Sequence, residues 1–154
     1  MQSLKEEIRQ NQEFESVQQE AIISLLLTTD RLKRRLSDLT GQYDITPQQY
    51  NVLRILYGAG SRGLPTLEIM NRMIERNPGI TRLLDRIDRK GLMTKQRSTS
   101  DRRTQICTIT PEGIRLIDEM SGPMKELTRD VMSHLDDKKL RDLLELLFLV
   151  RKGM

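Results

Sequence analysis

The hydrophobic period of the chain changes at Gly91, and this change constrains the fold more than any other feature of the sequence. Before Gly91, apolar residues recur at the helical spacing i, i+3, i+4 and i+7, as Ile80, Leu83, Leu84 and Ile87. This spacing predicts a helix with one apolar face. From Leu92 to Thr110 the pattern alternates with a period of two around the turn residues Ser98-Thr99-Ser100-Asp101. The sequence therefore predicts a helix that Gly91 closes, followed by a two-stranded β-hairpin with a basic tip.

Three helix starts, including that of the helix closed by Gly91, carry a small polar residue followed by proline, the pattern of an N-cap and the first helical position. They are Thr46-Pro47, Asn77-Pro78 and Thr110-Pro111. The first predicts a helix to about Tyr57, and the second predicts the helix that ends at Gly91. The third predicts a long helix that Ser121-Gly122-Pro123 should bend, because proline removes a backbone donor.

Between the first two of these helices, Gly58 to Gly63 is predicted to be a loop. Thr66 is the expected N-cap of a short helix that carries Leu67, Met70 and Met73. Met70, Met73 and Met93 are interpreted as core residues rather than as ligands. Two short helices joined by a tight connection, the second with a basic outer face, are typical of a helix-turn-helix.

The two ends of the chain are predicted to be helical. Ser3-Leu4-Lys5-Glu6 fits a capping box and should open one long helix that Gly41 ends. A last helix from about Asp137 carries a wide apolar stripe, which comprises Leu140, Leu143, Leu144, Leu147 and Phe148. This stripe is too wide for one surface helix in a protein of this size, so we expect it to pack against another chain.

Composition excludes several classes of function. A length of 154 residues fits one domain. One Cys and one His cannot form a disulfide or a structural zinc cage, so neither a metal nor another cofactor is expected. Aromatic residues at 3% with no Trp disfavour single-stranded nucleic-acid binding through base stacking. The longest apolar run, Leu146 to Val150, is far below the roughly 20 residues that span a bilayer, so we expect a cytoplasmic protein.

Positive charge is concentrated in one segment. Between Thr81 and Arg103 the chain has eight basic and three acidic residues, a net of +5, whereas the rest of the chain has a net of −1. A basic segment on a nearly neutral body favours a dedicated polyanion contact. No combination of nucleophile and base, and no glycine-rich phosphate loop, is visible, so an enzyme is not expected.

Three pieces of sequence in a fixed order resemble one known family. They are the stretch from Ile80 to Leu92, Ser100-Asp101-Arg102-Arg103, and Ile109-Thr110-Pro111-Glu112-Gly113. Together they resemble the MarR family of bacterial transcriptional regulators. The resemblance implies a mainly α fold in which long N- and C-terminal dimerisation helices flank a winged helix-turn-helix. It divides the single unit of residues 1–154 into a DNA-binding part, residues 44–110, and a helical dimerisation part, residues 1–43 and 111–154.

The resemblance also implies how the protein would bind DNA. It implies a homodimer on a pseudo-palindromic duplex, with a helix of each subunit in the major groove and the hairpin tip in the minor groove. The expected DNA-binding residues are Gly79, Thr81, Arg82, Arg86, Arg89, Arg102 and Arg103, and Asp101 is expected to stabilise the wing. Arg82 is the first candidate for base readout, while Arg86 and Arg89 are assigned to phosphate. Gly79 is assigned to backbone contact with phosphate.

Several alternatives stay open at this point. The minor-groove residue is either Arg102 or Arg103, and Lys90 and Lys95 are evenly balanced between DNA contact and a solvated surface. The leading function is sequence-specific regulation of transcription, as a repressor that responds to a small molecule, with unknown pocket residues. The alternative is a helical protein-interaction module whose basic segment is incidental. Cys107 is interpreted as a small strand residue and His134 as a capping or surface residue.

Overall fold

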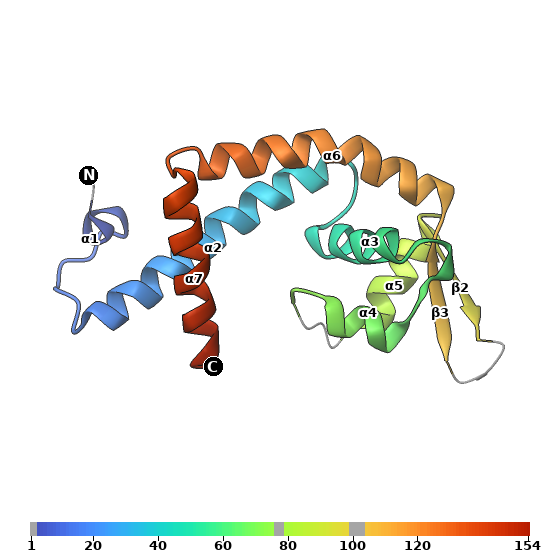
Figure 1. Ribbon diagram of the computed structural model, residues 1–154, viewed down its shortest axis with the longest axis horizontal. Helices are drawn as coiled ribbons and strands as arrows, with labels where there is room; N and C mark the ends of the chain where they lie inside the picture. The colour runs from blue at the N-terminus through green and yellow to red at the C-terminus, as the bar shows by residue number, and fades with distance from the viewer. Residues whose placement is uncertain (1–2, 76–78, 99–103) are drawn as a thin grey trace. The chain divides into compact units, whose positions relative to one another are not determined.

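A computed structural model of the chain describes residues 3–75, 79–98 and 104–154 (Figure 1). The chain divides into two compact units, residues 1–47 and residues 48–154. The division of the chain into parts at residues 43/44 and 110/111 stays a prediction.

The first unit contains two helices, α1 (Leu4–Glu7) and α2 (Val17–Gly41). The capping box at Ser3 is confirmed, because the Ser3 side chain accepts from the Glu6 N–H and the Glu6 carboxylate accepts from the Ser3 N–H. The prediction of one continuous helix from this point is wrong. Arg9 has a left-handed backbone with φ of 55°, and Ser16 caps a new helix by accepting from the Gln19 N–H. Two N-cap signals therefore start two helices.

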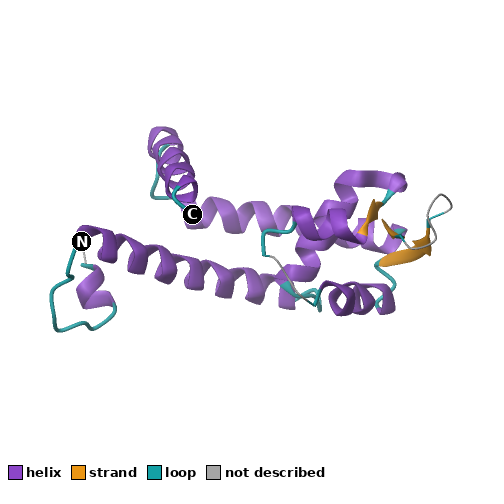
Figure 2. Ribbon diagram, turned by 90° about the horizontal axis from the view of Figure 1, so that it is seen from below, coloured by secondary structure: helices purple, strands orange, loops and turns teal. Residues whose placement is uncertain are grey.

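The second unit holds the remaining elements, with α3 beginning at the boundary. In chain order they are α3 (Pro47–Ala59), the 3₁₀ turn η1 (Gly60–Arg62), β1 (Leu64–Pro65), α4 (Thr66–Arg72), α5 (Ile80–Arg89), β2 (Met93–Arg97), β3 (Gln105–Ile109), α6 (Pro111–Met132) and α7 (Asp137–Lys152). In Figure 2 the strands are the short orange arrows beside the helices of this unit. The mainly α winged-helix fold predicted from the sequence is confirmed.

Most predicted helix starts lie where the sequence places them. Helices α3 and α6 begin at Pro47 and Pro111, and the Thr110 hydroxyl accepts from the Gly113 N–H. Asp136 caps α7 by accepting from the Lys139 N–H. Pro123 lies inside α6 without ending it, and the bend expected there stays a prediction.

Three local predictions are corrected. The supposed loop at residues 58–63 is largely helical, because α3 continues to Ala59 and η1 follows. The residue at the N-cap of α4 is Pro65 rather than Thr66, and Leu67 is 63% exposed while Ile69 is fully buried. Helix α5 begins at Ile80 rather than Pro78.

The start of α5 is set by its first hydrogen bond. Gly79 is the N-cap, and its carbonyl accepts the first bond of the helix, from the Leu83 N–H at 3.1 Å. Asn77 and Pro78 lie outside the described residues.

The sheet has three antiparallel strands in the order β1-β3-β2, one more than predicted. In the hairpin, Met93 pairs with Ile109 and Lys95 pairs with Cys107. The additional strand, β1, pairs Leu64 with Cys107 on the other side of β3. A two-residue strand is too short to produce an alternating pattern, so sequence periodicity cannot detect it.

The core of the second unit lies between α3, α4, α5, the sheet and the first half of α6. Its most deeply buried side chains include Val52, Leu53, Leu56, Ile69, Leu84, Ile87, Met93, Ile117 and Met120. Met73 and Met93 are buried as predicted, and Met70 is half-buried. Burying a Leu, Ile or Met side chain contributes about 1.5 to 3 kcal/mol, so this cluster fixes the helices against the sheet.

Helix α7 is different, because none of its residues is buried in the single chain. Its most exposed apolar side chains include Leu144, Leu146, Phe148 and Leu149, each at least 52% exposed. Within the part of the chain that the structure describes, no helix combines the length and the hydropathy needed to cross a membrane.

Candidate nucleic-acid interface

Helix α5 has a buried apolar face and an exposed basic face. Ile80, Leu83, Leu84 and Ile87 are all buried, at 9% exposure or less. Thr81, Arg82, Arg86 and Arg89 are exposed. The apolar spacing read from the sequence therefore sets the orientation of the helix, and this orientation turns its arginines towards solvent.

Two neighbouring stripes run along the exposed side of α5. Arg82, Arg86 and Arg89 follow the spacing i, i+4, i+7 and so share one stripe. Thr81, Asp85 and Asp88 form the adjacent stripe with the same spacing. Arg89 also donates from Nε to the Asp85 carbonyl oxygen at 3.2 Å, which holds its stem along the helix. The first stripe is thus a row of cations, and the second contains two carboxylates.

The N-terminus of α5 offers backbone donors. Gly79 is half-buried with φ of −94° and ψ of 27°, and as a glycine this N-cap residue has no side chain with which to cap the helix. The first N–H groups of any helix lack intrahelical acceptors, and they carry the positive end of the helix dipole. Gly79 and Thr81 are therefore brought together at an end of the helix that suits an anion.

The C-terminus of α5 leads directly into the wing. Gly91 has φ of 71°, and its N–H donates to the Asp88 carbonyl at 2.8 Å. The Leu92 N–H donates to the Ile87 carbonyl at 3.3 Å, so the two bonds form a Schellman motif. Glycine is suited to this position because only its backbone adopts a left-handed conformation without cost.

The residues at the base of the wing join three elements. The Thr110 hydroxyl donates to the Gly91 carbonyl at 2.7 Å and accepts from the Gly113 N–H at 3.1 Å. The Thr110 N–H donates to the Leu92 carbonyl at 3.1 Å. A Cβ on Gly113 would lie 2.2 Å from this same Leu92 oxygen, so the first turn of α6 fits here only with glycine. The motif Ile109 to Gly113 thus ties the end of α5 and the wing to α6.

The structure brings five of the predicted DNA-binding residues, Gly79, Thr81, Arg82, Arg86 and Arg89, together on one helix. Asp101, Arg102 and Arg103 lie outside the described residues, so their predicted roles at the wing tip stay predictions. The described strands nevertheless show where the wing starts, because β2 continues from the end of α5 and β3 leads back into α6 (Figure 1).

The structure shows an ionic partner for Lys95, whose role the sequence left open between DNA contact and a solvated surface. Its ammonium group forms an ion pair with the Asp85 carboxylate, and its side chain is only 18% exposed. The hydrogen bond that Lys95 donates to Asp85, together with the nearby carboxylate of Asp88, raises the pKa of Lys95, against a smaller opposing effect of burial. The strand register carries the signal for this contact, because Lys95 shares its face of the hairpin with the buried residues Met93 and Cys107.

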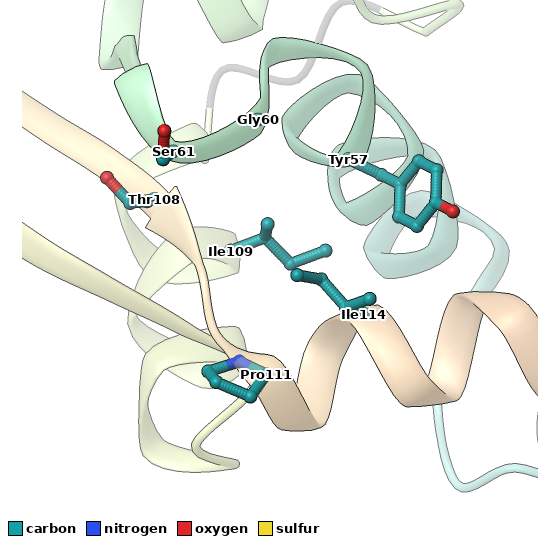
Figure 3. Close-up of a pocket in the computed structure, with 7 residues that line it drawn as sticks. All are labelled: Tyr57, Gly60, Ser61, Thr108, Ile109, Pro111 and Ile114. Atoms are coloured by element: carbon teal, nitrogen blue, oxygen red, sulfur yellow. The ribbon is translucent and has the colours of Figure 1, made fainter.

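A hollow of about 370 Å³ lies beside the base of the wing (Figure 3). Its lining residues come from α3, η1, β3 and the start of α6, and are Tyr57, Gly60, Ser61, Thr108, Ile109, Pro111 and Ile114. Figure 3 shows the Ser61 and Thr108 hydroxyls near one another and the Ile109 and Ile114 side chains facing each other. The lining is therefore mainly apolar, with hydroxyl groups at one side.

Tyr57 at the edge of this hollow links α3 to α6. Its hydroxyl donates to Asp118 Oδ1 at 2.9 Å, and the Arg54 guanidinium lies 5.7 Å from its ring centroid. The hydrogen bond to Asp118, with the charge of that carboxylate, raises the pKa of Tyr57. The contact therefore joins α3 to α6 through a phenol donor and a carboxylate acceptor.

The remaining candidate groups are structural or exposed. Cys107 lies on β3, as predicted, where it is fully buried, and this burial raises the pKa of its thiol. His134 is exposed just after the end of α6, as predicted. The described residues contain no group of three or more His, Cys, Asp and Glu side chains that could hold a metal ion.

The fold and the basic helix define a winged helix-turn-helix protein, and comparison with known proteins agrees. Residues 31–120 match the family model "Transcriptional regulator SarA/Rot". A MarR transcription factor from Planctomyces limnophilus is 34% identical over 89% of this chain and 99% of that chain, with a TM-score of 0.69. The uncharacterized HTH-type transcriptional regulator YsmB from Bacillus subtilis is 28% identical over 71% of this chain and 73% of its own length.

A further solved structure shares the fold. Sco3205 from Streptomyces coelicolor, a MarR family regulator in complex with DNA, has a TM-score of 0.81 at 18% identity, covering 94% of this chain and 92% of that chain. The chain therefore belongs to the MarR family of transcriptional regulators, in the group that the SarA/Rot model describes. The resemblance inferred from the sequence is confirmed, and the chain is a helix-turn-helix transcriptional regulator.

Proposed function

We propose that the protein binds a pseudo-palindromic duplex as a homodimer and represses transcription by occupying it. The observation that carries this proposal is the row of Arg82, Arg86 and Arg89 on the exposed side of a helix whose other side is buried. A rigidly held helix with a cationic face fits the major groove, which is wide enough to admit it. The Streptomyces relative crystallised with DNA supports the same use of the fold.

The exposed residues of α5 are assigned to different parts of the DNA according to their position along the helix. Arg82 lies in the first turn, where a side chain approaches base edges, and guanine accepts two hydrogen bonds from a guanidinium. Arg86 and Arg89 lie in the last turn and are assigned to phosphates. Gly79 and Thr81 supply N–H donors at the helix start for a further phosphate.

The wing supplies a second contact. We assign Arg102 to the minor groove, with Arg103 as the alternative, and Asp101 to stabilisation of the tip. Narrow A·T-rich minor grooves concentrate negative potential, which attracts arginine. The expected operator has two major-groove half-sites about 34 to 36 Å apart with A·T-rich flanks.

Dimerisation is assigned to residues 1–43 and 111–154. The exposed apolar side chains of α7, among them Leu144 and Phe148, support this assignment, because patches of this kind mark interfaces. The bound homodimer would act in the cytoplasm, where bacterial DNA lies, and its activity would be binding without a catalysed reaction.

A small-molecule effector is assigned to the hollow beside the wing. Its lining joins both predicted parts, because Thr108 and Ile109 belong to residues 44–110 whereas Pro111 and Ile114 belong to residues 111–154. Its volume of about 370 Å³ holds a compact apolar molecule with one hydrogen-bonding group. Binding there would act on the junction between the wing and α6.

The test is selection of bound duplexes from a random pool, followed by binding of variants to the selected duplex and to random duplex. Arg82→Ala should reduce the difference in binding free energy between the selected and the random duplex by about 1 to 3 kcal/mol. Arg89→Ala should weaken binding to both duplexes equally. Failure to enrich any sequence would contradict a sequence-specific regulator. Equal losses of specific and random binding in Arg82→Ala would contradict base readout by this residue.

A further inference from the structure

We propose that Lys95 is a positioning residue that fixes the wing against the recognition helix through its ion pair with Asp85, so that both elements read DNA as one rigid surface. The proposal rests on the proposed function, because it concerns how the same site achieves its sequence preference. It concerns a residue that does not itself contact DNA.

The first observation is the placement of Lys95 within the hairpin. Side chains alternate between the two faces of a strand, and Lys95 pairs with the fully buried Cys107, so it shares the helix-facing side of the sheet. A lysine on this side of a sheet needs an anionic partner, because burying an unpaired charge is costly. Asp85 of α5 is this partner.

The second observation is what surrounds the pair. Lys95 lies with Thr66, Thr81, Leu84 and Gln105 around a gap of only about 10 Å³, roughly the space of one water molecule. These neighbours come from α4, α5 and β3, so the lysine stem fills the space between the helix-turn-helix and the wing. Thr81 and Asp85 belong to the same stripe of α5.

The third observation concerns where the charge is directed. The Asp85 side chain is 43% exposed and the Lys95 side chain only 18%, so the ammonium points inwards to α5. Asp88 adds a second carboxylate near the same ammonium and, with Asp85, raises the pKa of Lys95. The charge of Lys95 is therefore engaged within the protein, unlike those of Arg82 and Arg86 on the adjacent stripe, which are exposed.

The consequence is that readout of the major groove by α5 is coupled to readout of the flanking minor groove by the wing. The hairpin follows α5 directly through Lys90 to Leu92, and at its base Thr110 is hydrogen-bonded to the Gly91 and Leu92 carbonyls. The ion pair of Lys95, further along β2, attaches the hairpin to α5 at a second point away from this base and so restricts hinging of the hairpin. A hinging wing would meet the flanking minor groove in many orientations and would lose its preference for groove shape.

The experiment measures binding of the full-length protein to the selected duplex with A·T-rich or G·C-rich flanks. The variants are Lys95→Met, which keeps the stem and removes the charge, Asp85→Asn, and the double variant. Lys95→Arg is the conservative control, and Lys90→Met removes the same charge at an exposed position of the same region. Thermal unfolding confirms that each variant is folded.

Lys95→Met and Asp85→Asn should each lower the ratio of A·T-flank to G·C-flank affinity about fivefold, the size of a typical coupling between contacting residues. The double variant should be no worse than Lys95→Met alone, and Lys95→Arg and Lys90→Met should keep the wild-type ratio. If Lys95→Met lowers the ratio while Asp85→Asn leaves it unchanged, Lys95 acts on DNA directly and the proposal is overturned.

A readout without DNA separates this proposal from the proposed function. Amide hydrogen exchange of β2 in the free protein should be faster in Lys95→Met and Asp85→Asn than in the wild type, with no change in α6. Unchanged exchange in both variants would overturn the proposal that Lys95 attaches the wing to α5, even if the protein binds its operator. A wild type that enriches no duplex would overturn the proposed function while leaving this exchange result meaningful.

Discussion

Replacement of Gly113 by alanine tests the junction between the wing and α6. The added Cβ would lie 2.2 Å from the Leu92 oxygen and 2.8 Å from Ile109 Cγ1. The Leu92 oxygen cannot easily withdraw, because it accepts from the Thr110 N–H at 3.1 Å. Either the first turn of α6 or the start of the hairpin must therefore move.

The expected magnitude follows from two opposing effects. Overpacking of a buried site costs about 1 to 3 kcal/mol. Alanine in place of glycine in a helix gains about 0.5 to 1 kcal/mol. We expect Gly113→Ala to lower the free energy of unfolding by about 1 to 2 kcal/mol.

Gly58→Ala is the matched control. Gly58 also lies in a helix, but a Cβ there would have nothing within 4 Å. This variant should keep or raise stability, by up to about 1 kcal/mol. Both changes are measured by urea unfolding followed by circular dichroism, at one protein concentration because a dimer's stability depends on it. A Gly113→Ala protein as stable as the wild type would refute the steric argument.

Three further predictions use other parts of the chain. Phe148→Asp should convert the dimer to monomer in sedimentation, because it places a charge in the apolar face of α7, whereas Leu67→Asp on the exposed side of α4 should leave it dimeric. Arg102→Ala should flatten the preference for A·T-rich flanks and reduce the salt dependence of binding, and an unchanged preference would transfer the role to Arg103. Cys107 should resist alkylation at pH 7.5 until the protein unfolds, because burial raises its pKa and blocks access; rapid labelling of the native protein would contradict this.

The sequence predicts best those elements whose signals are local. Thr110-Pro111 and Asp136 start helices by hydrogen bonds within a few residues, and Gly91 ends one by its own backbone conformation. Periodicity likewise identifies the buried face of α5, since four residues at helical spacing are enough to define it. These features require no knowledge of the rest of the fold.

The errors arise where two local signals compete or where the signal is distant. Ser3 and Ser16 are both good N-caps, and periodicity alone does not reveal that the chain leaves the helical conformation at Arg9 between them. The strand β1 depends on β3, more than 40 positions further along, as the pairing of Leu64 with Cys107 shows. The partner of Lys95 is found only when the hairpin register and the orientation of α5 are known together.

The residues of the candidate interface fall into two classes, those that the fold restricts and those that it leaves free to vary, and a sequence motif identifies the first class more readily than the second. Thr110 and Gly113 lie in crowded surroundings that admit few residue types, because each hydrogen bond or close approach restricts the backbone. Arg82 and Arg86 are exposed, so the fold does not restrict which residue stands there. The motif around Thr110 and Gly113 therefore indicates how the wing is joined to α6. Which operator sequence the protein prefers depends instead on exposed residues. For this reason the sequence identifies a DNA-binding regulator but leaves the bases it reads to be determined by selection from a random pool.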